Sequence, residues 1–234
     1  WLITQKPDFI VLIGPAQPSP GPTRARKMLV EAGIPTIVIS DGPARKIVKE
    51  FEADGLGHII VDADAMIGAR REFLDPVEMA LFNSDMIKVL AITGVLRVIA
   101  DELDDLIQSV KKGEKLDLPK LLVDKETAVE LSGLSNSYAK AKAMAAYEIA
   151  KSVAEVDSEA CFRVKEWERY VPLVASGHEM IRAAAKLADD AREIDKAGDS
   201  VLRKPHYADG SLGVKKKLVE KPQRVGKGEK EQHS

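Results

Sequence analysis

Charged side chains concentrate in residues 62–76 (DADAMIGARREFLDP), where six of the fifteen residues are Asp, Glu or Arg. Arg70 and Arg71 could clamp phosphate or carboxylate groups through paired N–H donors. Asp64 and Glu72 could pair with those arginines or accept N–H groups of a heterocyclic ligand. Strand-to-helix connectors usually span only ~2–6 residues. The segment therefore favours a ligand-binding loop, and a surface ion-pair cluster is the alternative.

Two other loops follow apolar runs. Residues 14–22 (GPAQPSPGP) hold four prolines and form a stiff loop, unlike the glycine-rich turns that cradle phosphate with N–H groups. This loop is either a rigid connector or a ligand-facing segment, because the helix that opens at Pro22 can hold an anion at its N-terminus. Asp41 either caps the helix that follows it or faces the same crevice, and we expect the cap. Asp75 is likewise expected to cap the helix after Pro76.

The remaining reactive residue types have no partners in the sequence. His178 is expected at the start of a helix, where packing or capping is more common than catalysis. Cys161 is the single cysteine, which excludes an internal disulfide framework and a multi-thiolate zinc site. No Glu-x-x-His, Cys-x-x-Cys, GxSxG or Cys–His pattern occurs, so the sequence predicts neither a protein-bound metal nor nucleophilic catalysis.

The elements that must position these residues follow an α/β pattern. Continuous apolar, β-branched runs at residues 8–13, 36–40 and 57–61 indicate strands buried on both faces, as in a parallel sheet. Helical segments at 23–32 and 44–54 lie between them, which indicates right-handed βαβ crossovers. We therefore predict a parallel sheet with flanking helices, followed by a helical segment and a C-terminal β-hairpin. Open α/β sheets bind ligands at the carboxyl ends of their strands, where the three loops above are placed.

The rest of the chain divides by composition. Residues 77–112 are mostly helical with Gly94 as a possible break, an alanine-rich helix covers 136–156 and suits bundle or subunit packing, and a last helix runs from about residue 175 to 196. The Asp209-Gly210 pair predicts a hairpin. The proposed units are an incomplete α/β cofactor-binding unit at 1–76, a helical segment at 77–199, a C-terminal β-hairpin at 200–222 and a basic disordered tail at 223–234.

Charge and hydropathy exclude several classes of protein. The net charge is −2, and the seven Lys/Arg and three Glu from Val214 onward leave a basic end without interleaved aromatic residues, so nucleic-acid binding is not predicted. No apolar run approaches the ~20 residues that span a bilayer, so no membrane association is predicted and the cytoplasm is the default compartment. Residues 1–5 are typical of the last turn of a helix, and we expect an N-terminally incomplete chain.

A family resemblance rests on two blocks, DAMIGARREFLDPVEMA at 64–80 and MIKVLAITGVLRV at 86–98. Together with PDFIVLIGP, KAMAAYEIA, ERYVPLVASGHEM and RKPHYADG in the same order, they resemble the coenzyme F420-dependent methylenetetrahydromethanopterin dehydrogenases of archaea. The resemblance covers residues 7–222. Members of that family begin with further strands and a glycine-containing loop that is expected to help bind the deazaflavin, and these are not found in this sequence.

The resemblance implies reversible hydride transfer in archaeal one-carbon metabolism, in methanogenesis or its reverse. The methylene carbon of the pterin gives hydride to C5 of the deazaflavin F420, which leaves a methenyl cation. The adjacent nitrogen lone pair stabilises that cation, so no metal, nucleophile or general base is required. The protein must hold two ring systems face to face and exclude water. The family is also expected to form a homohexamer, built as a trimer of dimers.

The resemblance also suggests roles for individual residues. Asp64 and Glu72 would offset the methenyl cation or bind the amino groups of the pterin, and the arginines would hold the anionic tail of the deazaflavin or those carboxylates. Met66 and Ile67 would pack on a ring. The cofactor-binding candidates are Gly14, Pro15, Met66, Ile67, Gly68, Arg70, Arg71 and Phe73, and the second-rank candidates are Asp41, His178 and Glu179.

Two other functions stay open at this point. A nicotinamide-dependent dehydrogenase would need a glycine-rich dinucleotide turn, which does not occur in the sequence. A truncated, non-catalytic paralogue that acts only as an assembly module is the second alternative.

Overall fold

A four-stranded parallel sheet forms the centre of the computed structural model, which describes residues 2–63 and 75–225. Its strands are β1 (Ile10–Ile13), β2 (Thr36–Asp41), β3 (Gly57–Val61) and β4 (Lys120–Val123), in the order β1-β2-β3-β4. The predicted α/β class and the three predicted strands are confirmed. The fourth strand was missed, because its four residues are too short a run to stand out within a helical region. The segment predicted as helical therefore supplies one strand to the sheet.

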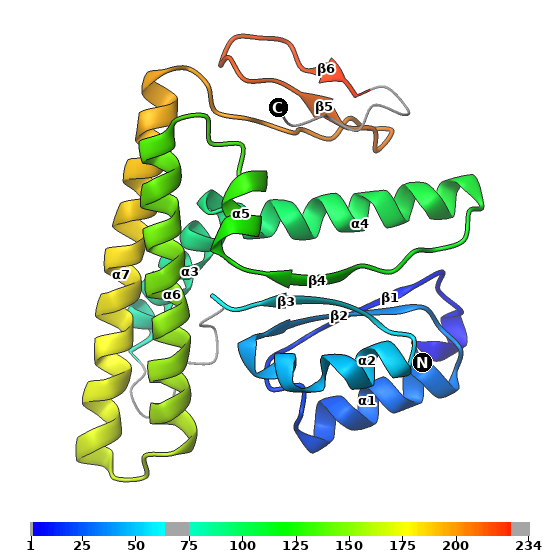
Figure 1. Ribbon diagram of the computed structural model, residues 1–234, viewed down its shortest axis with the longest axis horizontal. Helices are drawn as coiled ribbons and strands as arrows, with labels where there is room; N and C mark the ends of the chain where they lie inside the picture. Colours follow the sequence, from blue (N-terminus) through cyan, green and yellow to red (C-terminus); the bar gives the residue numbers. More distant parts are fainter. Residues whose placement is uncertain (1, 64–74, 226–234) are drawn as a thin grey trace.

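Helices cover both faces of the sheet (Figure 1). On one face lie α1 (Pro20–Glu31), the 3-10 helix η2 (Gly42–Ile47) and α2 (Val48–Ala53). Their core consists of Val38, Ala44, Phe51, Leu56 and Ile60. The predicted helix 44–54 thus begins as a 3-10 helix and becomes α-helical at Val48.

The opposite face of the sheet packs on α3 (Pro76–Ile92) and α4 (Val95–Lys112). Ile37 and Ile39 of β2 point to this face, whereas Val38 between them points to the other. This alternation explains why the strands read as continuous apolar runs. Gly94 separates the two helices with φ 100°, and a Cβ there would lie 2.1 Å from the Ala128 carbonyl oxygen. The predicted break at Gly94 is confirmed.

A long antiparallel helix pair stands beside the ends of the strands, as Figure 1 shows. It is formed by α6 (Ser137–Phe162) and α7 (Trp167–Ala197), and the short α5 (Lys125–Leu131) connects β4 to it. Alanines of both helices are fully buried, so their backbones approach closely: Ala139, Ala143, Ala146, Ala150, Ala184, Ala188 and Ala191. The helix predicted from about residue 175 begins eight residues earlier, with Pro172 inside it.

The C-terminal region is built around the predicted Asp209-Gly210 turn. Antiparallel bridges join Arg203 to Lys215 and His206 to Leu212, and Gly210 has φ 75°. The second arm of the hairpin contains β5 (Gly213–Val214), which pairs with β6 (Gln223–Arg224), so the first residues of the predicted tail join a sheet. A short 3-10 helix, η1 (Ile3–Gln5), precedes β1. Within residues 2–63 and 75–225, no helix has the length and apolar character needed to cross a membrane.

Candidate active site at the carboxyl ends of the strands

Loops after β1 and β2 are bonded to each other. The Gly14 carbonyl accepts hydrogen bonds from Gln17 Nε2 at 3.0 Å and from Ser40 Oγ at 2.8 Å. The backbone N–H of Ala16 donates to Asp41 Oδ1 at 3.3 Å. Asp41 occupies the N-cap position of η2, yet its side chain makes no capping bond. The expected cap is therefore wrong: this buried carboxylate turns to the neighbouring loop, which brings it together with Gly14.

A buried arginine of α1 holds the loop after β1 in place through hydrogen bonds. Arg26 of α1 donates from Nη1 to the Gln17 carbonyl at 2.7 Å and to Gln17 Oε1 at 2.8 Å. Its guanidinium lies 5.0 Å from the centroid of the Phe51 ring. Burial lowers the pKa of Arg26, with Glu50 and Asp54 acting in the opposite direction, but an arginine stays charged. The bonds from Arg26 hold the loop in place, and Pro15 is exposed.

A bidentate ion pair joins the ends of β2 and β3. Arg45 of η2 donates from Nε to Asp62 Oδ1 at 2.5 Å and from Nη2 to Asp62 Oδ2 at 2.6 Å. This hydrogen bonding raises the pKa of Arg45. Lys151 of α6 places Nζ 3.9 Å from the same carboxylate. Sequence reasoning missed Arg45 and Lys151, because they lie far from Asp62 in the chain and no local motif links them.

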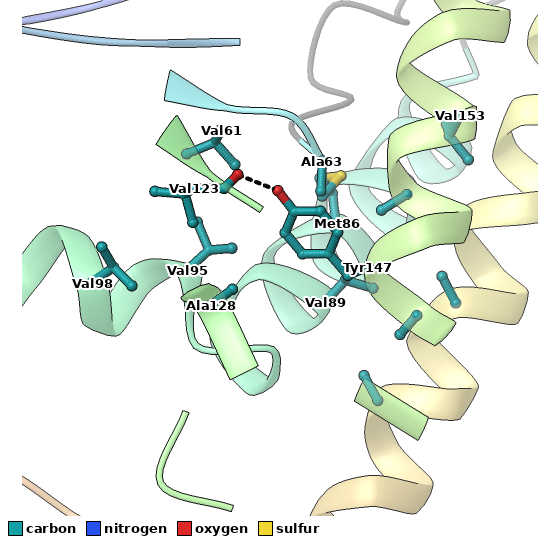
Figure 2. Packing of buried hydrophobic residues seen from close by; sticks show 14 of the residues in the cluster. Val61, Ala63, Met86, Val89, Val95, Val98, Val123, Ala128, Tyr147 and Val153 are labelled. Carbon is teal, nitrogen blue, oxygen red and sulfur yellow. Dashed lines mark hydrogen bonds between the residues drawn. The ribbon is translucent and has the colours of Figure 1, made fainter. Parts of the chain in front are cut away.

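Helix α6 is attached to the sheet edge by Tyr147. Its hydroxyl donates to the Val123 carbonyl at 2.5 Å, and its ring lies among Val61, Ala63 and Met86 (Figure 2). Burial raises the pKa of Tyr147 well above its ordinary value, so the phenol keeps its proton. Asp124, which follows β4, accepts from the Thr127 N–H at 2.8 Å and caps α5, and this bond lowers its pKa.

Most of the predicted ligand-binding residues lie outside the described part of the chain. They are Asp64, Met66, Ile67, Gly68, Arg70, Arg71, Glu72 and Phe73. The residues on either side are described: Ala63 is fully buried, and Asp75 Oδ1 accepts from the Val77 N–H at 2.7 Å. The predicted cap at the start of α3 is therefore confirmed.

Two of the second-rank candidates, His178 and Glu179, lie on α7. His178 lies in the middle of α7 and not at a helix start, so the predicted position is wrong. Its ring stacks on Phe82 with centroids 4.4 Å apart, and Nδ1 lies 3.3 Å from Glu78 Oε1. Glu179 is exposed and pairs with Arg182 at 3.0 Å. The contacts of His178 join α7 to the first turns of α3.

The fold is an open parallel α/β sheet, a class of protein that binds ligands at the carboxyl ends of its strands. Within the described residues, no group of three or more His, Cys, Asp or Glu side chains could hold a metal ion. The family model for methylene-5,6,7,8-tetrahydromethanopterin dehydrogenase matches residues 2–223. The chain belongs to this family, which confirms the family inferred from the sequence blocks.

Individual relatives match over nearly the whole chain. The F420-dependent methylenetetrahydromethanopterin dehydrogenase of Methanocaldococcus jannaschii is 55% identical over 218 residues, which are 93% of this chain and 79% of the relative. The enzyme of Methanothermobacter marburgensis is 52% identical and covers 95% and 80% of the two chains. A solved F420-dependent enzyme in complex with methylene-tetrahydromethanopterin and coenzyme F420 superimposes with a TM-score of 0.88 at 53% identity, over 93% of this chain and 78% of that one.

Proposed function

We propose that the chain catalyses reversible hydride transfer between methylenetetrahydromethanopterin and coenzyme F420. The observation that carries this function is the match to a solved relative that holds both compounds, at 53% identity and a TM-score of 0.88. The superposition covers 93% of this chain and 78% of the relative. The protein is therefore an oxidoreductase of one-carbon metabolism, in methanogenesis or its reverse.

The residues at the sheet edge suit a reaction that depends on positioning. When bound, the deazaflavin accepts the hydride and the pterin supplies it, so the protein must orient two rings and keep water out. The Gly14 carbonyl and Asp41 are held by hydrogen bonds from neighbouring loops. The Arg45–Asp62 pair and the Tyr147 anchor fix the ends of β2, β3 and β4. Such a framework reduces the motion of bound rings without supplying a proton.

The direct ligand contacts remain proposals. Residues 64–73 are proposed to line the crevice, with Asp64 and Glu72 near the methenyl cation and with Arg70 and Arg71 near anionic groups. Their support is the position of the segment between the end of β3 and the start of α3. The division into units at 76, 199 and 222 also remains a proposal, with the qualification that β4 pairs with β3.

A non-catalytic assembly module is not favoured. The relatives that match this chain at 50–55% identity carry the name of the enzyme, and the sheet edge retains a bonded set of polar residues. A nicotinamide-dependent enzyme would require a glycine-rich turn after a strand, whereas the loop after β1 is rich in proline.

Self-association is proposed to accompany the activity, as a homohexamer built from dimers in the cytoplasm. The support is the outer face of α3, where Val77, Leu81 and Ile87 are exposed by 66%, 47% and 54%. The opposite face of α3 is buried in the core through Phe82, Met86 and Val89. A helix that is apolar on both sides is typical of an element buried in an assembly. The alanines of α6, in contrast, pack within the chain against α7.

A direct assay tests the proposed function. Purified protein is mixed with methylenetetrahydromethanopterin and either oxidised F420 or a nicotinamide dinucleotide, and the absorbance of each oxidant is followed. We expect F420 to be reduced only when the pterin is present, with no reduction of the nicotinamide. Reduction of the nicotinamide, or of neither oxidant, would contradict the proposal.

A further inference from the structure

Two cations share one carboxylate at the ends of β2 and β3. Asp62 receives two bonds from Arg45, at 2.5 and 2.6 Å, and lies 3.9 Å from Lys151 Nζ. Asp124, which follows β4, accepts from the N-terminus of α5 and attracts Arg45 from a greater distance than an ion pair. Among the described residues, Asp62 is therefore the one carboxylate within ion-pair distance of Arg45 or Lys151, and the two cations share it.

Donors of both cations remain available. Arg45 uses Nε and Nη2 for Asp62, and none of the described residues bonds to its Nη1. Lys151 makes no hydrogen bond within residues 2–63 and 75–225, and its ion pair with Asp62 is at the outer limit for such a contact. The side chains of Arg45 and Lys151 are 38% and 43% exposed, whereas that of Asp62 is 10% exposed. The carboxylate is thus covered and the two cations face outward.

Contacts with neighbouring residues fix the positions of both cations. The two bonds to Asp62 hold the guanidinium plane of Arg45 in one orientation. Lys151 lies one helical turn after Tyr147, on the same face of α6. Because the Tyr147 hydroxyl is bonded to the end of β4, the place where Lys151 leaves the helix is set relative to the sheet. Preorganised donors of this kind lower the cost of binding an anion.

We propose that Arg45 and Lys151 form a subsite for an oxyanion, a phosphate or carboxylate group, of one of the two substrates. Asp62 acts as a positioning residue that orients Arg45. This inference rests on the proposed function for the identity of the substrates. The subsite lies at the carboxyl ends of the strands, so an anionic tail would be held there while the ring occupies the crevice.

The test compares Lys151→Met with a matched control, Lys142→Met. Lys142 lies on the same helix, is 37% exposed and pairs with Asp190 at 2.9 Å, away from the sheet edge. The dissociation constants of F420 and of the pterin are measured separately by calorimetry at low and high salt. We expect Lys151→Met to raise the dissociation constant of one of the two substrates about tenfold or more. The salt dependence of that constant should also decrease, because one charge of the subsite is gone.

Arg45→Lys is a second variant, which keeps the positive charge but loses the paired N–H donors of the guanidinium group. It should weaken the binding of the same substrate as Lys151→Met does, by a smaller factor, and leave the binding of the other substrate unchanged. The substrate that is affected identifies the source of the oxyanion.

Unchanged constants for both substrates would overturn the subsite. Equal weakening of the binding of both substrates, together with a lower melting temperature, would show that Arg45 and Lys151 only stabilise the fold. That result would also overturn the subsite. Failure of the proposed function is distinguishable, because it appears as absent turnover in the unaltered protein, while the binding constants still decide the subsite.

Discussion

Asp157 provides a sharp test of the packing between α6 and α7. Its side chain is completely buried, and within the described residues neither carboxylate oxygen has a hydrogen-bond partner. It lies against Gly177 of α7, where a Cβ would come within 2.3 Å of Asp157 Oδ1. Val153 and Ala160, one turn away on either side, are also fully buried. The carboxyl group therefore lies in an apolar contact between two helices.

Burial raises the pKa of Asp157 from 3.8 to about 7, because the charged form loses its hydration. Between these values the folded state binds a proton that the unfolded state has released. The free energy of unfolding therefore falls as the pH rises from about 4 to about 7 and is constant above that range. A difference of about three pH units corresponds to about 4 kcal/mol.

Asp157→Asn keeps the shape and stays neutral at every pH. We expect the variant to exceed the unaltered protein by about 4 kcal/mol in unfolding free energy at about pH 8, and to match it within about 1 kcal/mol at about pH 4. For a chain of this length that gain corresponds to a rise in melting temperature of roughly 10 °C. Urea denaturation followed by circular dichroism at several pH values measures both quantities.

The control is Glu155→Gln, which removes an exposed carboxylate from the same helix. It should leave the stability at about pH 8 unchanged within ~0.5 kcal/mol, as surface substitutions usually do. The reasoning would be refuted if Asp157→Asn showed the same pH dependence as the unaltered protein, or if it were the less stable of the two at about pH 8.

Three further variants test other parts of the account. Gly94→Ala should destabilise the fold by about 3 kcal/mol, since its φ is positive and its Cβ would meet the Ala128 carbonyl, and a denaturation midpoint measures this. Arg26→Met should cost about 3 kcal/mol in the same assay through the lost bonds to Gln17. Burial lowers the pKa of His58, so stability is lost as the pH falls below 6.5. His58→Leu should reduce the drop in melting temperature between about pH 7 and about pH 5, and an equal drop would contradict this.

Much of the fold is encoded in local patterns. The runs at 36–40 and 57–61 are apolar at every position because both faces of the sheet are covered, and they were placed correctly. Gly94 and the Asp209-Gly210 pair were informative because Gly94 and Gly210 adopt positive φ values, which few other residue types tolerate. Asp75 was predictable as a cap because its partner lies two residues away.

The features that were missed depend on contacts between distant residues. Strand β4 is short, and it is a strand because β3 lies beside it. Asp41 precedes a helix that it could cap, but its carboxylate accepts a hydrogen bond from the N–H of Ala16, in the neighbouring loop. Lys151 appears in the sequence as an ordinary helix-surface lysine, and only the fold brings it to Asp62. Asp157 similarly resembles a solvent-facing residue until α7 covers it.

The central claim is that hydride passes directly between two substrates held at the carboxyl ends of the strands. The most direct measurement uses methylenetetrahydromethanopterin that carries deuterium at the methylene carbon, with oxidised F420 in ordinary water. We predict that the reduced F420 contains deuterium at C5, as shown by mass spectrometry and nuclear magnetic resonance. Reduced F420 that contains only protium from the solvent at C5 would contradict direct transfer.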